Sequence, residues 1–561
     1  MFLGLQALGY SKHLKMRNKK ILFVSEAPWY STGYSVYTTQ VLKRLYKENN
    51  LEIAQLGIYV EENDPKINQY PWKIYWNKPS QSNKHYNKYK SSPSAQFGDF
   101  MFNETLLDFM PDIVIDIRDW WMVEFEQRSP FRNFYKWALM PTVDAEPQNN
   151  QWINTYESAD AIFAYSEFGR DTMMKQCDNI NFIDVASPSA SEVFSPVPNK
   201  ETHKENNGVS KDSIIIGTVM RNQKRKLYPD LFKSFRKFLD SCNNHNVFLY
   251  CHTYYPDIGW DIPHLLDEFN LSNKVLFTYK CKKCSNISTD FFQDALQMCK
   301  KCGNFSNQLV GISNSITEKE LANIYNLFDI YVQYANSEGF GMPQLEAAFC
   351  GLPVISIYYS AMQSVIDNIG GIGINPISFS KECETGCNRA IPDNNQFVEE
   401  LNKLISLSKK EINSIGVQTM NKARNAYSWD ATAKKWLDYI ESQDIIDENK
   451  TWKSPINIKQ PADKIPSNLK SITEKVNFLF TNVLHKPEWI YSFFWRKILR
   501  DCTYGYRCAN VEPDFYFNES HIQNYNSHKT FSIDDAFKEL SNYRQQINIW
   551  ENARQRKISQ K

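Results

Sequence analysis

Short apolar segments alternate with longer segments of helical spacing along this chain, in two series. Near-continuous apolar strands alternating with helices are typical of parallel sheets that helices cover on both faces. The first series contains KILFVSE at 20–26, DIVIDIR at 112–118 and AIFAYSE at 161–167. The second contains SIIIGTVM at 213–220, VFLYCHT at 247–253, IYVQYA at 330–335 and PVISIYY at 353–359. The pattern predicts an α/β protein with two doubly wound domains.

Length, charge and cysteine content limit the class of protein. A chain of 561 residues can hold two large domains with additions. Its 64 Lys and Arg nearly balance its 63 Asp and Glu, which argues against a general nucleic-acid coat protein. A balanced net charge still allows local basic patches. The sequence has neither an apolar run long enough for a membrane span nor a basic leader. Twelve cysteines are too few for a disulfide framework, and four have metal-site spacing, so we expect a cytoplasmic protein with reduced thiols.

The domain organisation follows from changes in composition. We expect an N-terminal Rossmann-like domain over 1–210 and a C-terminal one over 211–442. Residues 200–212 are polar and without periodicity, which predicts a hinge. Within the second domain, 279–305 is predicted to be an insertion, and 443–561 to be a linker with a mainly helical extension. The aromatic segment PEWIYSFFWRKIL of this extension is predicted to pack on the body of the protein, with a membrane-surface helix as the alternative.

The segment NSEGFGMPQLEAAFCGLPVIS, residues 336–356, is predicted to form a loop and a short helix after the strand at 330–335. Pro343 suits the first position of a helix, and Gly351 ends it. Ligands of open α/β sheets bind outside the carboxyl ends of strands, and helix N-termini attract phosphate. The segment therefore predicts a ligand site at the mouth of this strand.

The side chains of this loop suit a sugar nucleotide. Gly339 and Gly341 allow the backbone to approach a ligand closely, and they leave amides free to donate hydrogen bonds. Glu338 and Glu346 can accept hydrogen bonds from sugar hydroxyls. The alternative is an ordinary capped core helix with a solvated Glu346.

Two cations follow the first strand of the second series, in GTVMRNQKRKLYPDLFKSF at 217–235. Arg221 can grip phosphate with two parallel hydrogen bonds, and Lys226 acts as a point charge. Together they would neutralise a diphosphate. A solvated basic loop is the alternative interpretation of the same residues.

The two glutamates with seven residues between them, taken with Arg221 and Lys226, resemble the retaining GT-B glycosyltransferases of the large GT4-like family, the glycosyl transferases group 1. The resemblance covers about residues 18–442. Further matching segments are YSTGYSVYTTQVL at 30–42, YSEFGRD at 165–171, ITEKELANIYNLFDIYV at 316–332 and YSW at 427–429. The resemblance implies two Rossmann-like domains facing a cleft, with a nucleotide-sugar donor on the second domain and the acceptor on the first.

The resemblance also implies roles for single residues. The residue matching Glu338 contacts donor-sugar hydroxyls near the reacting carbon, and the one matching Glu346 holds the ribose. Those matching Arg221 and Lys226 stabilise the departing diphosphate, where preorganised cations are most effective, so no catalytic metal is expected. The donor is expected to be a UDP- or GDP-sugar. Backbone positions expected to line the ligand are Gly33, Gly339, Phe340 and Gly341.

One segment departs from the family pattern. Many members have a histidine near the donor sugar, whereas MPTVDAEPQNNQW at 140–152 offers Asp144 and Glu146. Asp144 is predicted to bind a sugar hydroxyl or to assist the acceptor proton, with a turn or cap residue as the alternative. Asp119, in DIRDWWM, is a weaker candidate for which a structural role is expected.

Two CKKC motifs place cysteines at positions 281, 284, 299 and 302. Four thiolates complete a closed tetrahedral zinc site, so Cys281, Cys284, Cys299 and Cys302 are predicted to bind structural zinc in a ribbon. Reduced cysteines without metal are the alternative. Six lysines against two aspartates between 274 and 304 make this segment basic. Contact with a nucleic-acid backbone is one interpretation, and a solvated surface is the other.

The sequence thus predicts a glycosyltransferase that moves a sugar from a nucleoside diphosphate to an acceptor hydroxyl with retention of configuration. The acceptor class stays open among glycans, proteins, small molecules and nucleic acid. Two alternatives are transfer to hydroxylated bases of DNA and a non-catalytic scaffold or binding module with the same fold.

Overall fold

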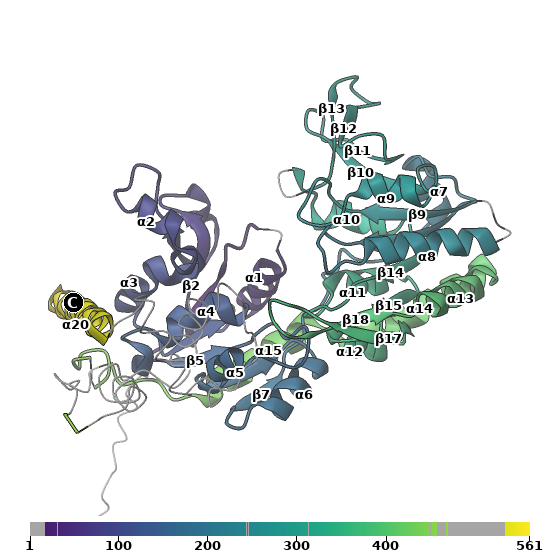
Figure 1. Cartoon of the computed structure of the whole chain (residues 1–561). Helices are drawn as coiled ribbons and strands as arrows, with labels where there is room; N and C mark the ends of the chain where they lie inside the picture. Colours follow the sequence, from purple (N-terminus) through teal and green to yellow (C-terminus); the bar gives the residue numbers. More distant parts are fainter. Residues whose placement is uncertain are drawn as a thin grey trace, which may run out of the picture.

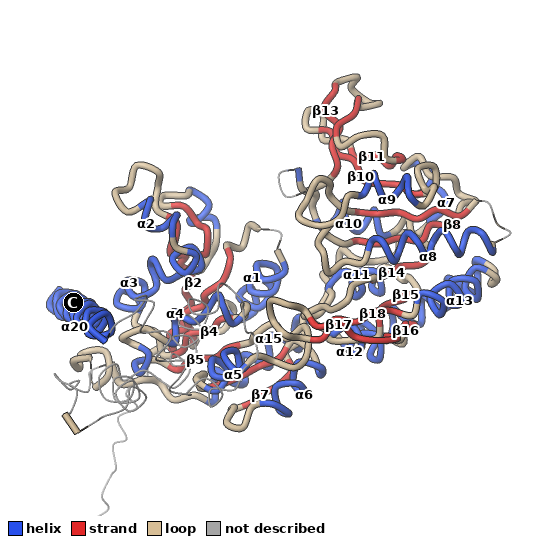
Figure 2. The backbone as a smooth tube through the Cα atoms, viewed as in Figure 1, coloured by secondary structure: helices blue, strands red, loops and turns tan. Residues whose placement is uncertain are grey.

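The computed structural model describes residues 17–456, apart from positions 31, 243, 245, 312, 313 and 449, together with 467–468 and 533–560. Two α/β domains lie side by side, the first drawn in purple to blue and the second in teal to green (Figure 1). Each contains a sheet with helices packed around it (Figure 2). The expected pair of doubly wound domains is confirmed.

The N-terminal sheet has seven strands in the order β3-β2-β1-β4-β5-β6-β7. All neighbours run parallel, and β1 and β4 are almost completely buried because their apolar residues face helices on both sides. The strands are β1 Lys19–Glu26, β2 Leu51–Glu61, β3 Lys73–Lys78, β4 Ile113–Asp116, β5 Lys136–Leu139, β6 Ala161–Ala164 and β7 Phe182–Val185. The helices are α1 Gly33–Leu45, η1 Pro65–Gln69, α2 Tyr86–Ser91, η2 Ala95–Asp99, α3 Phe100–Phe109, α4 Trp120–Gln127, η3 Arg132–Phe134, α5 Asn150–Glu157 and α6 Glu167–Gln176.

The C-terminal sheet has nine strands, in the order β12-β13-β10-β9-β8-β14-β15-β16, with β11 also paired to β10. Its strands are β8 Ile214–Val219, β9 Val247–His252, β10 Val275–Cys281, β11 Ile287–Phe291, β12 Leu296–Met298, β13 Phe305–Leu309, β14 Ile330–Gln333, β15 Val354–Ile357 and β16 Ile372–Ile374. A separate hairpin consists of β17 Pro376–Lys381 and β18 Asn388–Pro392. The helices are α7 Lys200–Asn206, α8 Tyr228–Ser241, α9 Ile262–Glu268, α10 Glu318–Tyr325, α11 Met342–Phe349, α12 Ala361–Ile369, α13 Asn394–Ile405 and α14 Lys409–Ala426.

The polar segment at 200–212 differs from the expected irregular hinge, because it begins with helix α7. The Asn199 side chain caps this helix by accepting from the Thr202 amide. Lys204 is buried, pairs with Asp329 and donates to the Ser213 carbonyl at 2.9 Å. A buried ion pair therefore orders a segment whose composition predicts a flexible linker.

Two later helices lie against the N-terminal domain. In α15, Trp429–Ser442, the Trp436 ring stacks on Phe163 with ring centres 4.0 Å apart. In α20, Ile533–Gln560, Lys557 lies 3.0 Å from Asp108. The expected helical extension is therefore present over this last segment, whereas the aromatic segment PEWIYSFFWRKIL lies outside the described residues. In the part of the chain that the structure describes, every helix is too short or too polar to cross a membrane.

Candidate functional site

The predicted loop and helix at 336–356 form at the carboxyl end of β14. Gly341 adopts φ +87, a left-handed conformation that favours glycine, and it immediately precedes α11. Pro343 lies in the first turn of that helix, where its missing amide hydrogen costs no hydrogen bond. The sequence thus folds this segment into a tight loop followed by an open helix N-terminus.

Glu338 is buried and lies between two cations. Its carboxylate pairs with Lys226 and with Arg225, and it accepts a hydrogen bond from Gln333 Nε2 at 2.9 Å. The backbone amide of Glu338 donates a hydrogen bond to the Ser360 hydroxyl at 3.0 Å. These contacts fix the orientation of the carboxylate.

The cations after β8 separate into two groups. Arg221 is half-exposed and forms two hydrogen bonds to Asp257, at 2.8 and 3.0 Å, whereas Lys226 is buried against Glu338. Burial, and then the charge of Arg225, lower the pKa of Lys226 well below its usual value. Sequence reasoning missed Arg225, which also donates to the Ser337 carbonyl at 3.2 Å. The basic run RNQKRK was its only signal, because it does not specify which cation faces the loop.

Asp144 of the N-terminal domain faces the Glu338 loop. It pairs with a cation that sequence analysis did not identify. Arg389, on β18, lies 2.8 Å from the Asp144 carboxylate and also donates to the Ser337 hydroxyl. Its other nitrogen pairs with Glu382 at 2.6 Å. The hairpin β17–β18 thus brings a buried guanidinium to the boundary between the domains.

The N-terminal domain contributes further polar groups at this boundary. Tyr34 and Thr142 share a hydroxyl–hydroxyl hydrogen bond of 3.1 Å. Burial raises the pKa of Asp119 to about 6, against the opposing effect of hydrogen bonds with these two side chains. The charge of Asp144 adds to the increase. Asp119, for which a structural role is expected, thus lies beside Tyr34 and Thr142 in the N-terminal domain.

The glycines of the site differ in their surroundings. A methyl group on Gly339 would lie 2.1 Å from Thr142 Cγ2, so the loop touches the N-terminal domain directly. A methyl group on Gly33, the first residue of α1, would meet none of the described residues within 4 Å. Phe340 is buried and packs edge-on against Tyr427, with ring centres 5.7 Å apart. The loop therefore anchors its aromatic residue in the core, while Gly339 faces the other domain.

Glu346, on α11, accepts a hydrogen bond from the Tyr325 hydroxyl at 2.8 Å. Burial raises the pKa of Glu346 to about 7, and the nearby Glu318 carboxylate adds to the increase, while the hydrogen bond from Tyr325 opposes it. A carboxyl group with this pKa changes charge near neutral pH.

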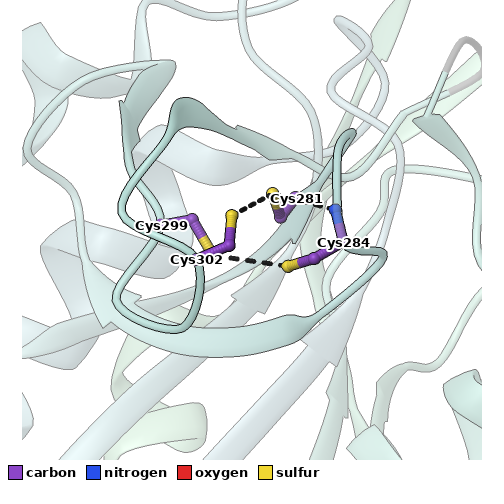
Figure 3. Close-up of side chains that lie close together, drawn as sticks. All are labelled: Cys281, Cys284, Cys299 and Cys302. Carbon is purple, nitrogen blue, oxygen red and sulfur yellow. Dashed lines mark hydrogen bonds between the residues drawn. The ribbon is translucent and has the colours of Figure 1, made fainter.

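The four cysteines of the CKKC motifs converge on one point (Figure 3). The sulfurs of Cys281 and Cys302 are 3.6 Å apart, those of Cys284 and Cys299 are 3.7 Å apart, and all four lie within 4.8 Å of one another. Tetrahedral zinc with bonds of about 2.3 Å separates its sulfurs by about 3.8 Å. The donor set and spacing therefore fit a zinc ion.

The two cysteine turns repeat one local structure. The Cys281 amide donates to the Asn286 carbonyl at 2.9 Å, and the Cys299 amide donates to the Asn304 carbonyl at 2.8 Å. The residue after each second cysteine is left-handed, with φ 56 at Ser285 and φ 68 at Gly303. The near-identical sequences CKKCSN and CKKCGN thus give two equivalent turns, each with two ligand sulfurs.

Residues 297–411 match the family described as Glycosyl transferases group 1. This stretch contains β14, the Glu338 loop, α11 and the β17–β18 hairpin. The chain is a glycosyltransferase. A comparison with curated protein sequences gives no significant match.

Solved structures of similar fold include glycosyltransferases. Sucrose-phosphate synthase from Thermosynechococcus elongatus aligns with a TM-score of 0.54 and 14% identity, covering 76% of this chain and 98% of that one. HepE from Anabaena, in complex with UDP and glucose, gives a TM-score of 0.53 and 11% identity, covering 76% of this chain and 100% of that one. A glycosyltransferase from Rickettsia africae gives 0.51 and 14% identity, with coverages of 76% and 98%. The expected GT-B fold of this glycosyltransferase is confirmed.

Proposed function

We propose that this glycosyltransferase belongs to the GT4-like family and transfers a sugar from a nucleoside diphosphate to an acceptor hydroxyl with retention of configuration. The observation that carries the proposal is Glu338, a buried carboxylate held between Lys226 and Arg225 at the carboxyl end of β14. Ligands of open α/β sheets bind at this edge, and a fixed carboxylate there can accept hydrogen bonds from a donor sugar.

The cations beside Glu338 suit a departing diphosphate. Lys226 and Arg225 lie next to its carboxylate, whereas Arg221 is more exposed and pairs with Asp257. Negative charge develops on the leaving group during transfer, and preorganised cations stabilise it most where water is excluded. We therefore assign the diphosphate to these three side chains, and we expect no catalytic metal.

The remaining site residues divide between the two domains. We assign the donor to the domain over 211–442, with the ribose on Glu346 and the backbone at Gly339 to Gly341 beside the phosphates. We assign the acceptor to the domain over 1–210, where Asp144 faces the loop at Ser337 and a methyl group on Gly33 would meet none of the described residues within 4 Å. UDP is the first choice of donor nucleotide, because the similar fold of HepE holds UDP.

A nucleotide panel tests the donor site. Melting curves are recorded with UDP, GDP, ADP, CDP and dTDP for wild type, Arg221→Ala and the control Arg236→Ala, whose guanidinium pairs with Asp240 on the surface of α8. A ligand at about a hundred times its dissociation constant adds about 2.7 kcal/mol of stability. We expect one nucleotide to raise the melting temperature of wild type and control, and to do so less for Arg221→Ala. No shift with any of the five would contradict the proposal.

We also propose that the cysteine cluster binds one structural zinc ion. The test is metal analysis of purified protein, comparing wild type with Cys299→Ser and with Cys242→Ser, a cysteine outside the cluster. Wild type and Cys242→Ser are expected to contain one equivalent of zinc, and Cys299→Ser far less. Equal metal content in all three would contradict the assignment.

Nucleic acid is a second candidate for the acceptor, because the cysteine turns expose four lysines. All four are exposed, Lys282, Lys283, Lys300 and Lys301, and Phe305, which follows the second cysteine turn in the chain, is 65% exposed. Cations and exposed aromatic rings suit phosphates and bases. Binding to DNA that weakens steeply with salt would favour this acceptor, and absent or salt-insensitive binding would exclude it.

A further inference from the structure

We propose that the base of the cysteine segment forms the wall of the donor site at the nucleoside end, so that metal binding and nucleotide binding strengthen each other. The inference rests on the proposed function. We call Lys280, Asn314 and Ser315 the ribbon root, because they flank the point where residues 281–309 leave and rejoin the C-terminal domain.

The topology places the ribbon root on the edge of the sheet that carries the donor site. Strands β10, β9, β8 and β14 are parallel neighbours in that order. The carboxyl end of β8 leads to the three cations, and that of β14 leads to Glu338. The carboxyl end of β10 leads directly into the first cysteine turn, because Cys281 is its last residue. Donor site and cysteine segment therefore start from one edge of one sheet.

The strand between them supplies a further contact at this edge. The loop after β9 contains Asp257, which holds Arg221, and Tyr254, whose ring lies against Gly311. A methyl group on Gly311 would lie 2.5 Å from the Tyr254 ring. The chain that returns from the cysteine segment thus packs on the loop that positions a predicted phosphate-binding arginine.

Hydrogen bonds connect the ribbon root with α10. The Lys280 ammonium donates to the Ser315 carbonyl at 2.8 Å and lies 3.6 Å from the Glu320 carboxylate. The Asn314 side chain donates to the Lys280 carbonyl at 2.9 Å. Glu320 also forms the capping box of α10 with Thr317. The residue before the first metal ligand therefore holds the start of α10.

Helix α10 continues from the ribbon root to the predicted ribose site. Its eight residues extend about 12 Å at 1.5 Å per residue. Tyr325, at its end, donates to Glu346, and Glu318, in its first turn, lies close enough to influence the charge of that group. A nucleotide whose ribose binds Glu346 and whose phosphates bind the three cations would direct its base toward this helix and the ribbon root.

A metal ion would order this wall before the nucleotide arrives. Four ligands in two turns fix Cys281, and through it the position of Lys280 and the start of α10. Preorganised sites bind more tightly because less conformational entropy is lost on binding. The coupling is reciprocal, so a nucleotide that uses the wall must also strengthen metal binding.

The test compares two ligands on the full chain. Titration calorimetry measures the affinity for UDP and for inorganic diphosphate, with zinc-loaded protein and with protein stripped by a chelator. Diphosphate reaches the cations but has no nucleoside. We expect stripping to weaken UDP binding about tenfold, a coupling of about 1.4 kcal/mol, and to change diphosphate binding less than twofold. Circular dichroism checks that the stripped protein stays folded.

A point variant keeps the test valid where stripping unfolds the protein. Lys280→Met removes the contacts to Ser315 and Glu320 but leaves all four cysteines. Its control is Lys409→Met, which also removes an ammonium that donates to a backbone carbonyl, that of Lys211 at 2.9 Å. We expect Lys280→Met to weaken UDP binding several-fold with diphosphate binding unchanged, and the control to match wild type.

The outcomes separate this inference from the proposed function. If zinc-loaded wild type binds no nucleoside diphosphate, the proposed function fails. If it binds UDP with the same affinity after stripping and in Lys280→Met, the donor site stands and the coupling is wrong. Equal weakening of UDP and diphosphate would show a general loosening of the domain, which also contradicts a wall at the nucleoside end.

Discussion

The guanidinium of Arg389 lies 2.8 Å from the carboxylate of Asp144, although 245 residues separate them in the chain. Arg389 belongs to the hairpin of the C-terminal domain, and Asp144 follows β5 of the N-terminal domain. The same guanidinium donates to Ser337, the residue before Glu338. One buried cation thus connects the N-terminal domain with the loop that carries the predicted reaction centre.

This relationship predicts non-additive effects of mutation. Arg389→Ala and Asp144→Asn should each lower kcat/KM about tenfold, because either change breaks the ion pair that holds the two domains together beside the Glu338 loop. The double variant should be little worse than either single one, which corresponds to a coupling of about 1.4 kcal/mol. Steady-state kinetics of the four proteins measures it, with Lys175→Ala as control, since Lys175 makes a solvent-exposed pair with Glu146. Fully additive effects would show that the pair does not act as a unit.

Replacement of the central carboxylate should affect transfer rather than binding. Glu338→Gln keeps the shape of the side chain but removes the charge between Lys226 and Arg225. We expect kcat to fall about 10²- to 10³-fold, the usual effect of losing one electrostatic contact to the transition state, while UDP affinity changes less than threefold. Initial rates and calorimetry give the two quantities. Wild-type kcat in this variant would remove Glu338 from the chemistry.

The sequence predicts those parts of this molecule that depend on local pattern. Strands such as β8 and β14 are apolar and buried on both faces, so their composition indicates them. Glu338 and Lys226 follow such strands, and the rule that ligands bind at carboxyl ends predicts their side of the sheet. Strand β17 is exposed along most of its length and belongs to a separate two-stranded sheet, so the pattern of buried apolar strands does not mark this hairpin.

Other site residues depend on contacts between distant segments. Arg389 reaches the site through the packing of two domains, which no local spacing encodes. Arg225 and Arg221 stand four positions apart in one basic run, and only the structure shows that one faces Glu338 while the other faces Asp257. Helix α7 likewise depends on Lys204 meeting Asp329, which is 125 residues away.

The contact between Gly339 and Thr142 predicts a steric rescue. Gly339→Ala places a methyl group 2.1 Å from Thr142 Cγ2, so the loop or the opposite domain must move. We expect activity to fall at least tenfold. Thr142→Ser removes that methyl group and keeps the hydroxyl that bonds Tyr34, and the next contact, to Thr142 Cβ at 3.6 Å, is an ordinary one.

The double variant Gly339→Ala with Thr142→Ser should therefore recover most of the lost activity. Thr142→Ser alone serves as control and should be close to wild type. Initial rates of wild type, the two single variants and the double variant test this expectation. A double variant as impaired as Gly339→Ala would mean that the loss comes from the loop backbone and not from contact between the domains.

The raised pKa of Glu346 predicts how the affinity for a nucleotide depends on pH. Its pKa in the folded protein is about 7, raised first by burial, so the group is mostly protonated at pH 6 and mostly ionised at pH 8. The folded state thus holds a proton that the unfolded chain has released, and the stability this gives is lost as pH rises through 7. In the proposed donor site, ribose hydroxyls would donate to the ionised carboxylate, so a proton on Glu346 would compete with the nucleotide.

We therefore expect the affinity for UDP to increase about tenfold between pH 6 and pH 8, since the binding-competent fraction grows by about that factor. The terminal phosphate of UDP also titrates, with a pKa near 6, and contributes a dependence of the same sign. Glu346→Gln separates the two effects, because it leaves the phosphate and removes the carboxyl group. Calorimetry at several pH values should give a steeper increase for wild type than for Glu346→Gln. Identical pH profiles would mean that the nucleotide does not bind against Glu346, and the ribose would then have to be assigned elsewhere along α11.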